Sequence, residues 1–434
     1  MRVLVIGAGV VGTASAWYLA RAGHQVTVLE RHPGPALETS QNAAGLVSMA
    51  TAQPWTSPAR LPAVIGRLLR EDAALQLPLR GPWAQWRWAL ALAREHRPER
   101  HARHRLALAS LARYSRDSLV ELRRETGIRY GHLSRGVLSL YADPQAFGDA
   151  SAGLAELGEH AAQFEAVDAD AAARIEPALR PFADRFAGAM FCAGDETGDG
   201  HRFTRELARH CEAAGVRFRY GTEVLAVDRQ GERVTGARVA GRSGRGRDGA
   251  TAAGGARIAT DTVSADAVVL AAGVRSAALA GALGLELRLL AAKRHCVTVP
   301  VLQPQRAPVT GLIDDAQQFV VTRVGERLRV AGPSRGGALD SEPDIAECEA
   351  LLQHARRMFP DACDWSRVEF RAGLCACTPS NRPWVGSTPI RNLFVNAGHG
   401  PNGWTLACGS ARIVADLVSG RRPPLEVPLG STPD

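Results

Sequence analysis

The first 31 residues constrain the fold more than any other part of this chain. They read MRVLVIGAGVVGTASAWYLARAGHQVTVLER, with a continuous apolar run, the spacing Gly7-x-Gly9-x-x-Gly12, an amphipathic stretch ending near Gly23, and a second apolar run. Such a pattern predicts a strand, a tight glycine turn, a helix and a parallel strand buried on both faces. We therefore expect an α/β fold that contains a Rossmann-like unit.

The chemistry of this unit follows from its glycines and from one acidic residue. Glycines in the turn let the backbone approach a pyrophosphate, and the helix N-terminus holds its negative charge. Glu30 ends the second apolar run, where a carboxylate accepts hydrogen bonds from an adenosine ribose and disfavours a 2′-phosphate. The unit is thus predicted to bind FAD or NAD. Its candidate cofactor-binding residues are Gly7, Gly9, Val10, Val11, Gly12, Glu30 and Arg31.

Length and composition indicate how many domains the chain has and in which compartment it works. A chain of 434 residues exceeds what one hydrophobic core usually supports, so two domains are expected, one of them built from discontinuous segments. The glycines argue against a secretory signal at the N-terminus, and no run of 18 apolar residues predicts a membrane span. Eight scattered cysteines form no disulfide framework, which favours a reducing cytoplasmic setting.

The net charge of +8 invites a search for an anionic partner. The densest basic cluster, REHRPERHARHR at 94–105, has no interleaved aromatic residue and also carries acids, so nucleic acid is not expected. We interpret it as a solvated face on which His101 and His104 are surface residues without a metal; contact with a membrane surface or an acidic substrate is the alternative. Trp83, Trp86 and Arg87, just upstream, are expected to pack beneath an amphipathic helix.

Two later segments favour FAD over NAD. Residues 265–273, ADAVVLAAG, predict a second buried strand that ends in a glycine. The segment from 392 to 420, NLFVNAGHGPNGWTLACGSARIVADLVSG, predicts a strand, a glycine-rich turn and a helix whose dipole could stabilise an anionic reduced flavin. The Gly- and Arg-rich stretch 241–256 is predicted to be a flexible surface loop. These segments, with one earlier strand, add the cofactor-binding candidates Val224, Ala272, Gly273, Gly398, His399, Gly400, Gly403, Trp404 and Thr405.

Nearly the whole chain resembles the FAD-dependent amino-acid oxidoreductases of the D-amino-acid oxidase and glycine oxidase superfamily, and within it the D-amino-acid dehydrogenases. The resemblance rests on VIGAGVVGTASAWYLARAGHQVTV, on ETS at 38–40, AARIEPAL at 172–179 and DETGD at 195–199, and most specifically on the C-terminal segment. It implies that Thr39, Ser40 and Gly45 also contact a non-covalently bound FAD. It further implies an FAD domain of 1–82, 165–285 and 365–434, with a sheet-containing substrate or cap domain of 83–164 and 286–364.

The same resemblance implies a reaction. A hydride would pass from the α-carbon of a D-amino acid to flavin N5, the imine would hydrolyse, and a quinone-like acceptor would take the electrons. The setting would be cytoplasmic, with peripheral contact to the inner face of the membrane. Two alternatives stay open. In the first, the substrate is a cyclic or N-substituted amino acid of the D-proline type, or another amine. In the second, the chain is a catalytically weak FAD-binding subunit of a hetero-oligomer.

The substrate side departs from the family pattern. Where the family has an Arg in Gly-Leu-Arg-Pro that clamps the substrate carboxylate, this chain has Gly373-Leu374-Cys375-Ala376. Cys375-Ala376-Cys377 is a poor zinc motif without a second pair, and a disulfide is disfavoured in a reducing compartment. A covalent flavin tether, inert packing, or replacement of the clamp remain, and the last is preferred. The candidate catalytic residues are Cys375, Arg294, His295, Gln317 and Arg335, of which Arg294 or Arg335 would hold the substrate anion.

Overall fold

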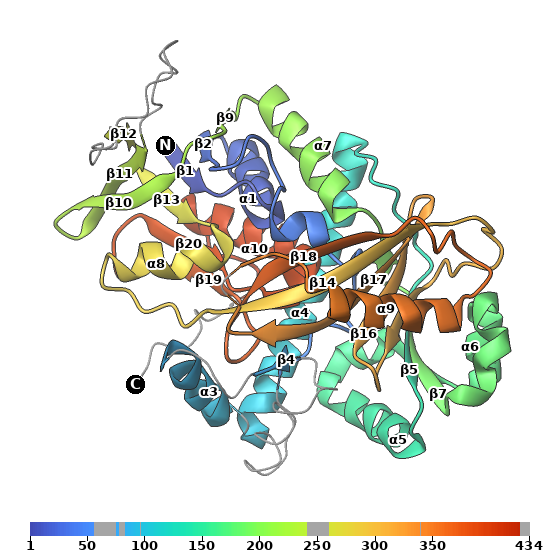
Figure 1. Ribbon diagram of the computed structural model, residues 1–434. Coiled ribbons are helices and arrows are strands. Elements are labelled where there is room, and N and C mark those ends of the chain that lie inside the picture. Colours follow the sequence, from blue (N-terminus) through green and yellow to red (C-terminus); the bar gives the residue numbers. More distant parts are fainter. Residues whose placement is uncertain (56–74, 78–82, 96, 241–259, 339, 426–434) are drawn as a thin grey trace.

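The computed structural model describes residues 1–55, 75–77, 83–95, 97–240, 260–338 and 340–425, and these contain two large sheets (Figure 1). The helices are α1 Val10–Arg21, α3 Trp83–Glu95, α4 Pro98–Thr126, α5 Pro144–Ala152, α6 Ala169–Ile175, α7 Gly200–Ala213, α8 Ser276–Gly281, α9 Ile345–Met358 and α10 Gly403–Val418. The strands are β1 Arg2–Ile6, β2 Gln25–Leu29, β3 Leu46–Val47, β4 Leu75–Gln76, β5 Val137–Tyr141, β6 Phe164–Val167, β7 Gly188–Cys192, β8 Glu196–Thr197, β9 Arg217–Arg219, β10 Val224–Gln230, β11 Arg233–Ala240, β12 Thr260–Ser264, β13 Ala267–Leu270, β14 Leu290–Pro300, β15 Gly311–Asp314, β16 Phe319–Val324, β17 Arg327–Gly336, β18 Glu369–Cys377, β19 Trp384–Ser387 and β20 Leu393–Ala397.

The first sheet confirms the βαβ prediction. It has the order β19-β20-β13-β1-β2-β9, and β1 pairs in parallel with β2 on one side and with β13 on the other. Because strand residues alternate between faces, Val3 and Val5 pack beneath α1, α7 and α10, whereas Leu4 and Ile6 face α8 and the β10-β11-β12 sheet. The sheet is therefore a doubly covered parallel layer, as the continuous apolar runs predict.

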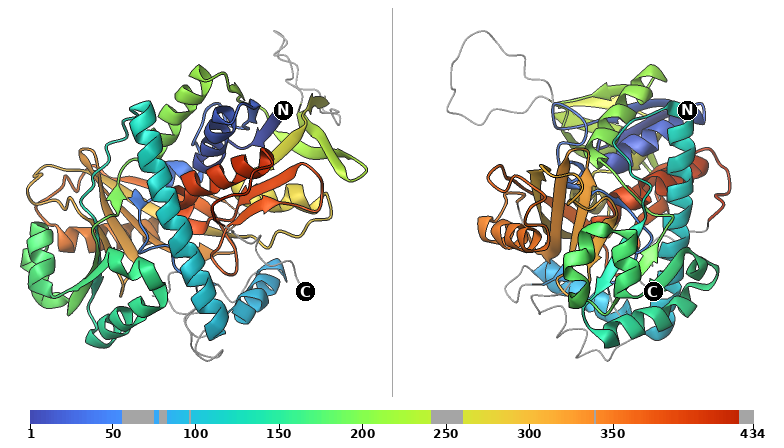
Figure 2. Two further views of the ribbon diagram at one scale, coloured as in Figure 1. Left: turned by 180° about the vertical axis from the view of Figure 1, so that it is seen from behind. Right: turned by 90° about the vertical axis from the view of Figure 1, so that its right-hand side faces the viewer.

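The second sheet has nine strands and is drawn from distant parts of the chain. Its main path is β18-β14-β17-β16-β15-β5-β7-β6, with β4 paired to β17. Helices α6 and α9 pack on this sheet and enclose a second core. Figure 2 shows the two layers side by side, with α4 running along the back of the molecule. The fold is mixed α/β, in agreement with the predicted class.

The strand pairing refines the expected domain division. Residues 165–192 and 365–377 are assigned to the FAD domain from the sequence, yet β6, β7 and β18 pair within the nine-stranded sheet. Helix α4, assigned to the cap, packs against α10: the Gly409 N–H donates to the Ser115 hydroxyl at 3.0 Å. We propose that these strands belong to the substrate domain and that α4 belongs to the FAD domain.

Two local expectations of the sequence analysis come out differently. Trp83 and Trp86 are 75% and 41% exposed rather than packed beneath α3, because the buried face of this helix carries Trp88 and Leu92 instead. His101 and His104 are buried rather than on the surface. The predicted loop at 241–256 lies outside the described residues. In the part of the chain that is described, none of the helices is both long and apolar enough to span a membrane.

Candidate active site

A cavity opens at the carboxyl edge of the parallel sheet. Its walls come from the β1–α1 turn, the end of β2, the segment after β13, and the loop between β20 and α10. Ligands of open α/β sheets bind at this edge, in the crevice where the strand order reverses. Its lining runs from the β1–α1 turn to the start of α10 and includes Leu374 and Ala376 of the second sheet, so the cavity extends between the two sheets.

The glycine turn shapes one end of the cavity. Gly7 has a φ of +104°, and a Cβ there would lie 2.6 Å from the carbonyl oxygen of Ala271. A Cβ on Gly12 would collide with the carbonyl oxygen of Gly7, so this residue permits close strand–helix contact rather than lining the cavity. The cap residue of α1, Gly9, has no side chain, and the Val10 N–H donates to the Ser40 hydroxyl at 2.9 Å. The N-terminus of α1 still faces the cavity, where its dipole can stabilise phosphate charge.

Glu30 is held in place at the end of β2. Its two carboxylate oxygens accept the N–H groups of Ala8 at 2.7 Å and of His32 at 2.8 Å. Each oxygen retains lone pairs that face the cavity wall, so the carboxylate can also accept from ribose hydroxyls.

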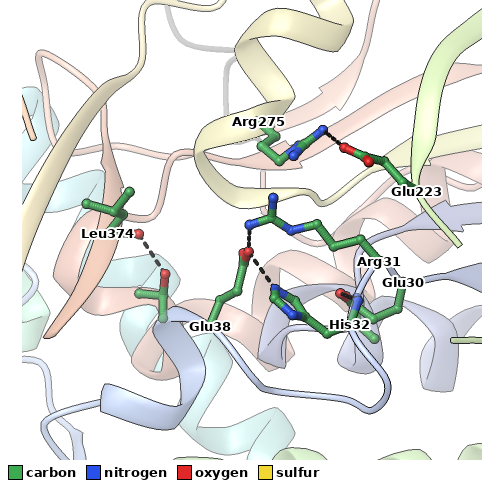
Figure 3. Close-up of polar contacts among 9 residues, drawn as sticks. Glu30, Arg31, His32, Glu38, Glu223, Arg275 and Leu374 are labelled. Carbon is green, nitrogen blue, oxygen red and sulfur yellow. Dashed lines mark hydrogen bonds and ion pairs between the residues drawn. The ribbon is translucent and has the colours of Figure 1, made fainter. Parts of the chain in front are cut away.

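Charged side chains pair with one another beside Glu30, as Figure 3 shows. Glu38 pairs with Arg31 and with the His32 ring, the latter at 2.9 Å, while Arg275 pairs with Glu223. These pairs leave the Glu30 carboxylate as the free acceptor at this end.

The opposite end is built by the C-terminal glycine-rich turn. Gly398 and Gly400 both have positive φ, and α10 then begins at Gly403 without a side-chain cap, with its first residues lining the cavity. Burial lowers the pKa of His399 to about 3, so its ring is neutral and hydrogen-bonds to the Ser410 hydroxyl at 3.0 Å. An uncapped helix N-terminus stabilises negative charge, which is what a reduced flavin develops. The residues present therefore fit an FAD with its pyrophosphate at α1 and its ring system at α10.

A second cavity adjoins the first and shares residues of both helix N-termini with it. Its described walls are Val10, Thr39, Ser40, Asn42, Ala43, Ala44, Gly200, Arg294, Gly373, Cys375, Gly400, Pro401, Gly403 and Trp404. Arg294 is the one charged side chain among them. The cavity lies where a substrate would meet the ring system of the cofactor.

Arg294 has the features of an anion-binding residue. Its Nε donates to the carbonyl oxygen of Gly332 at 2.7 Å, which fixes the plane of the guanidinium. Burial lowers its pKa, and the nearby side chains that oppose this effect are the thiols of Cys375, Cys296 and Cys377. No carboxylate forms an ion pair with it anywhere in the described ranges. Its two terminal nitrogens are thus available for a bidentate contact.

Cys375 lies beside Arg294 in the same wall. Strand pairing sets Ala292 opposite Cys375 and Arg294 opposite Gly373, so all four residues share one face of the sheet. Burial raises the pKa of the Cys375 thiol, and that of Cys377 even more. Both thiols are therefore protonated at neutral pH, which makes them poor nucleophiles for a covalent flavin tether. Nor does any cluster of potential metal ligands occur within the described residues.

The other three candidate catalytic residues do not reach either cavity. His295 follows Arg294 on β14 and so points to the opposite face, where its Nε2 accepts from the Asp344 N–H at 3.1 Å. Arg335 lies on that face too and is paired with Glu347. Gln317 is exposed in the turn between β15 and β16.

Most of the candidate cofactor residues do line a cavity. These are Gly7, Gly9, Val10, Val11, Glu30, Arg31, Thr39, Ser40, Val224, Ala272, Gly273, Gly398, His399, Gly400, Gly403 and Trp404. Gly12, Gly45 and Thr405 lie behind the wall and support it. The Thr405 hydroxyl, for example, contacts the carbonyl of Leu46 and the N–H of Ser48.

Several wall residues were missed by the sequence analysis. They include Asn42, Ala43, Ala44, Glu38, Glu223, Arg275 and Asn396. Asn42 and Ala43 follow the ETS motif directly, so that motif could have been extended to find them. Glu223 and Arg275 belong to separate segments that meet only in the folded chain, and no local signal marks them.

The chain is similar to known proteins along its full length. Residues 2–417 match the DAO family model of FAD dependent oxidoreductases. The chain is 42% identical over 426 residues to a D-amino acid dehydrogenase of Paramagnetospirillum magneticum, with 97% of this chain and 96% of the relative covered. It is 40% identical over 429 residues to that of Dechloromonas aromatica, with 99% of each chain covered.

Solved structures agree with the fold. Glycine oxidase from Geobacillus kaustophilus superposes with a TM-score of 0.70 at 24% identity, covering 98% of this chain and 97% of that one. L-proline dehydrogenase from P. horikoshii gives a TM-score of 0.71 at 16% identity, covering 98% and 95%. The likeness extends over both sheets, because nearly the whole of each chain is covered. The chain belongs to the DAO family of FAD-dependent oxidoreductases.

Proposed function

We propose that this protein is a dehydrogenase of D-amino acids that carries out FAD-dependent oxidative deamination. The observation that supports this proposal most is the Arg294 guanidinium, which lies in the cavity next to the FAD site and has no carboxylate partner among the described residues. Full-length similarity to D-amino acid dehydrogenases supports the same reaction. Bound FAD would supply the two-electron oxidant for the Cα–H and Cα–N centre.

The residues of the chain would bind and orient the substrate. Arg294 would accept the α-carboxylate in a bidentate fork, and the fixed Nε contact to Gly332 would set the direction of the Cα–H bond. The described wall contains no Asp, Glu, His or Lys side chain, so the substrate would bind with its amine already neutral or would lose the proton to water. Orientation rather than acid–base catalysis is thus the main contribution of the wall.

The wall also favours one class of side chain. Ala43, Ala44 and Gly200 leave room beside the Trp404 ring; a basic group there would meet no opposite charge among the described wall residues, and an acidic group would meet only Arg294, which is committed to the α-carboxylate. We therefore expect D-amino acids with apolar side chains to be better substrates than acidic or basic ones. Electrons would pass to a quinone-like acceptor, at the cytoplasmic face of a membrane.

Anaerobic reduction of the flavin tests this proposal. The FAD-loaded protein is mixed with D-alanine, D-phenylalanine, D-proline, D-lysine, D-glutamate and the L-enantiomers, and the loss of the flavin absorbance is followed. Rapid bleaching by apolar D-amino acids is expected. Bleaching by D-proline alone would indicate the N-substituted class instead, and no bleaching by any compound would favour a catalytically weak FAD-binding subunit.

A further inference from the structure

Helix α3 presents large apolar side chains to solvent on one side. Trp83 is 75% exposed, Trp86 41% and Leu90 58%, and Arg87 and Arg94 lie between and beyond them. Spacings of three and four residues put all five on the same face of the helix. We call this set the α3 stripe. Exposed single apolar residues are ordinary, but two tryptophans and a leucine in one row are not.

The stripe is rigidly held, because the other face of α3 is anchored in a core. Trp88 and Leu92 are buried in the cluster that also contains Cys375 and Cys377. The Trp88 Nε1 donates to the carbonyl oxygen of Cys377 at 2.9 Å. Helix α3 therefore lies on the outer side of β14 and β18, the strands that carry Arg294 and Cys375. Figures 1 and 2 both place α3 at the periphery of the molecule.

Positive charge surrounds the stripe. Arg94, Arg97 and Arg103 are exposed, and none of them forms an ion pair within the described residues. Arg87 is paired with Glu286 at 2.5 Å. Of the nearby acids, Glu95 is buried against His104 at 2.8 Å, whereas Glu99 is exposed in the first turn of α4 and offsets one of these positive charges.

This combination matches one kind of partner. Tryptophan prefers the boundary between lipid headgroups and acyl chains, and arginines beside an apolar stripe are attracted to anionic lipids. A protein partner would need a complementary acidic and apolar groove, whereas an anionic bilayer supplies both features without a specific shape.

We propose that the α3 stripe docks the protein on an anionic membrane surface. Trp83, Trp86 and Leu90 enter the interface, and Arg94 and Arg97 contact lipid phosphates. Only the biological reason for this docking rests on the proposed function. A quinone dissolved in the membrane would then be close to β14 and β18, the strands next to α3 that line the substrate cavity. The docking itself follows from exposure and charge.

Vesicle flotation tests the docking. The FAD-loaded, full-length protein is mixed with vesicles of phosphatidylcholine alone or with 30% phosphatidylglycerol, and the floating fraction is measured. We expect binding to the anionic vesicles that weakens with added salt. The variant Trp83→Ser/Trp86→Ser/Leu90→Ser should bind at least about tenfold more weakly, and Arg94→Gln/Arg97→Gln about fivefold more weakly for each arginine lost.

Matched controls separate the stripe from general surface effects. The control Leu225→Ser/Leu302→Ser removes side chains that are 42% and 64% exposed elsewhere on the molecule, and it should float like the wild type. The proposal is overturned if the wild type does not float with anionic vesicles, if the stripe variant floats equally well, or if the control loses binding to the same extent. A wild-type dimer that the stripe variant converts to a monomer, without vesicle binding, would instead assign the stripe to a second copy of the chain.

A second readout distinguishes this inference from the proposed function. Anaerobic flavin reduction by D-alanine, without vesicles, should be the same in the wild type and the stripe variant. Normal reduction without flotation would refute the docking alone, and flotation without reduction would refute the enzymatic proposal alone.

Discussion

Replacing Arg294 by alanine should remove the contact that holds the substrate carboxylate. The guanidinium is half-buried, its Nε is committed to Gly332, and its two terminal nitrogens face a cavity with no other described charge. Two charge-assisted hydrogen bonds to a carboxylate, discounted for residual solvent, are worth about 3 kcal/mol. The value of kcat/KM for D-alanine should therefore fall roughly a hundredfold.

Two further variants give this prediction its controls. Arg294→Lys keeps the charge but loses the planar fork, so a loss of about tenfold is expected. Arg335→Ala removes an exposed arginine that is paired with Glu347 on the opposite face of the sheet, and it should change kcat/KM by less than about twofold. Steady-state rates with an artificial electron acceptor would measure all three.

Cys375 supplies a rescue experiment. From the sequence alone, Cys375→Arg is expected to improve turnover by restoring the family clamp. The structure changes that expectation, since Arg294 already lines the cavity and a second guanidinium in the same wall would repel it. We expect the single variant to lower kcat/KM, and the double variant Arg294→Ala/Cys375→Arg to recover at least about tenfold over Arg294→Ala.

One result would refute this reasoning. If Arg294→Ala retains kcat/KM within about twofold of the wild type for every D-amino acid tested, the guanidinium does not bind the substrate. The substrate would then be an amine without a carboxylate, or its anion would be held elsewhere.

Three other outcomes are expected. Acid or heat should release the flavin as free FAD, because Cys375 and Cys377 are buried, protonated thiols; yellow colour left on the denatured polypeptide would contradict this. Glu30→Ala should weaken FAD binding by roughly tenfold to a hundredfold in a titration of the apoprotein, whereas Glu30→Gln, which keeps one acceptor, should weaken it less. Burial lowers the pKa of His399 to about 3, so below its ordinary value of 6.5 the unfolded chain takes up a proton that the folded chain does not. The contribution of His399 to the free energy of unfolding should thus fall by about 2 kcal/mol between about pH 7.5 and pH 5, and His399→Gln should lose this part of the pH dependence.

The nucleotide-binding half could be predicted from the sequence because its signals are local. The turn from Gly7 to Gly12 and the carboxylate of Glu30 lie within one βαβ unit, and steric limits on a strand–helix turn fix their arrangement. The turn from Gly398 to Gly403 is equally self-contained. Residues such as Arg275 were not predicted, because they reach the cavity only when distant segments of the chain meet in the fold.

The substrate-binding residues were harder to predict, because side chains on a strand alternate between the two faces of the sheet. The sequence alone does not show which of two neighbouring residues faces the cavity. Arg294 and His295 are neighbours, yet one lines the cavity and the other faces α9. An error of one position in the strand assignment exchanges them. On helix α3 a similar small error in the assigned face made Trp83 and Trp86 look like packing residues, although the buried face carries Trp88.

Cys375 lines the cavity and pairs with Ala292. We infer from this that only one of the positions 294 and 375 can carry an arginine. Arg294 and Cys375 lie diagonally on adjacent antiparallel strands and face the same small space. Two arginines there would repel each other with no carboxylate to separate them, and neither would leave room for the substrate. A chain of this fold with Arg at the position of Cys375 should therefore carry a small or uncharged residue at the position of Arg294. An alignment in which both positions are commonly Arg would contradict the idea that the clamp has moved from one strand to its neighbour.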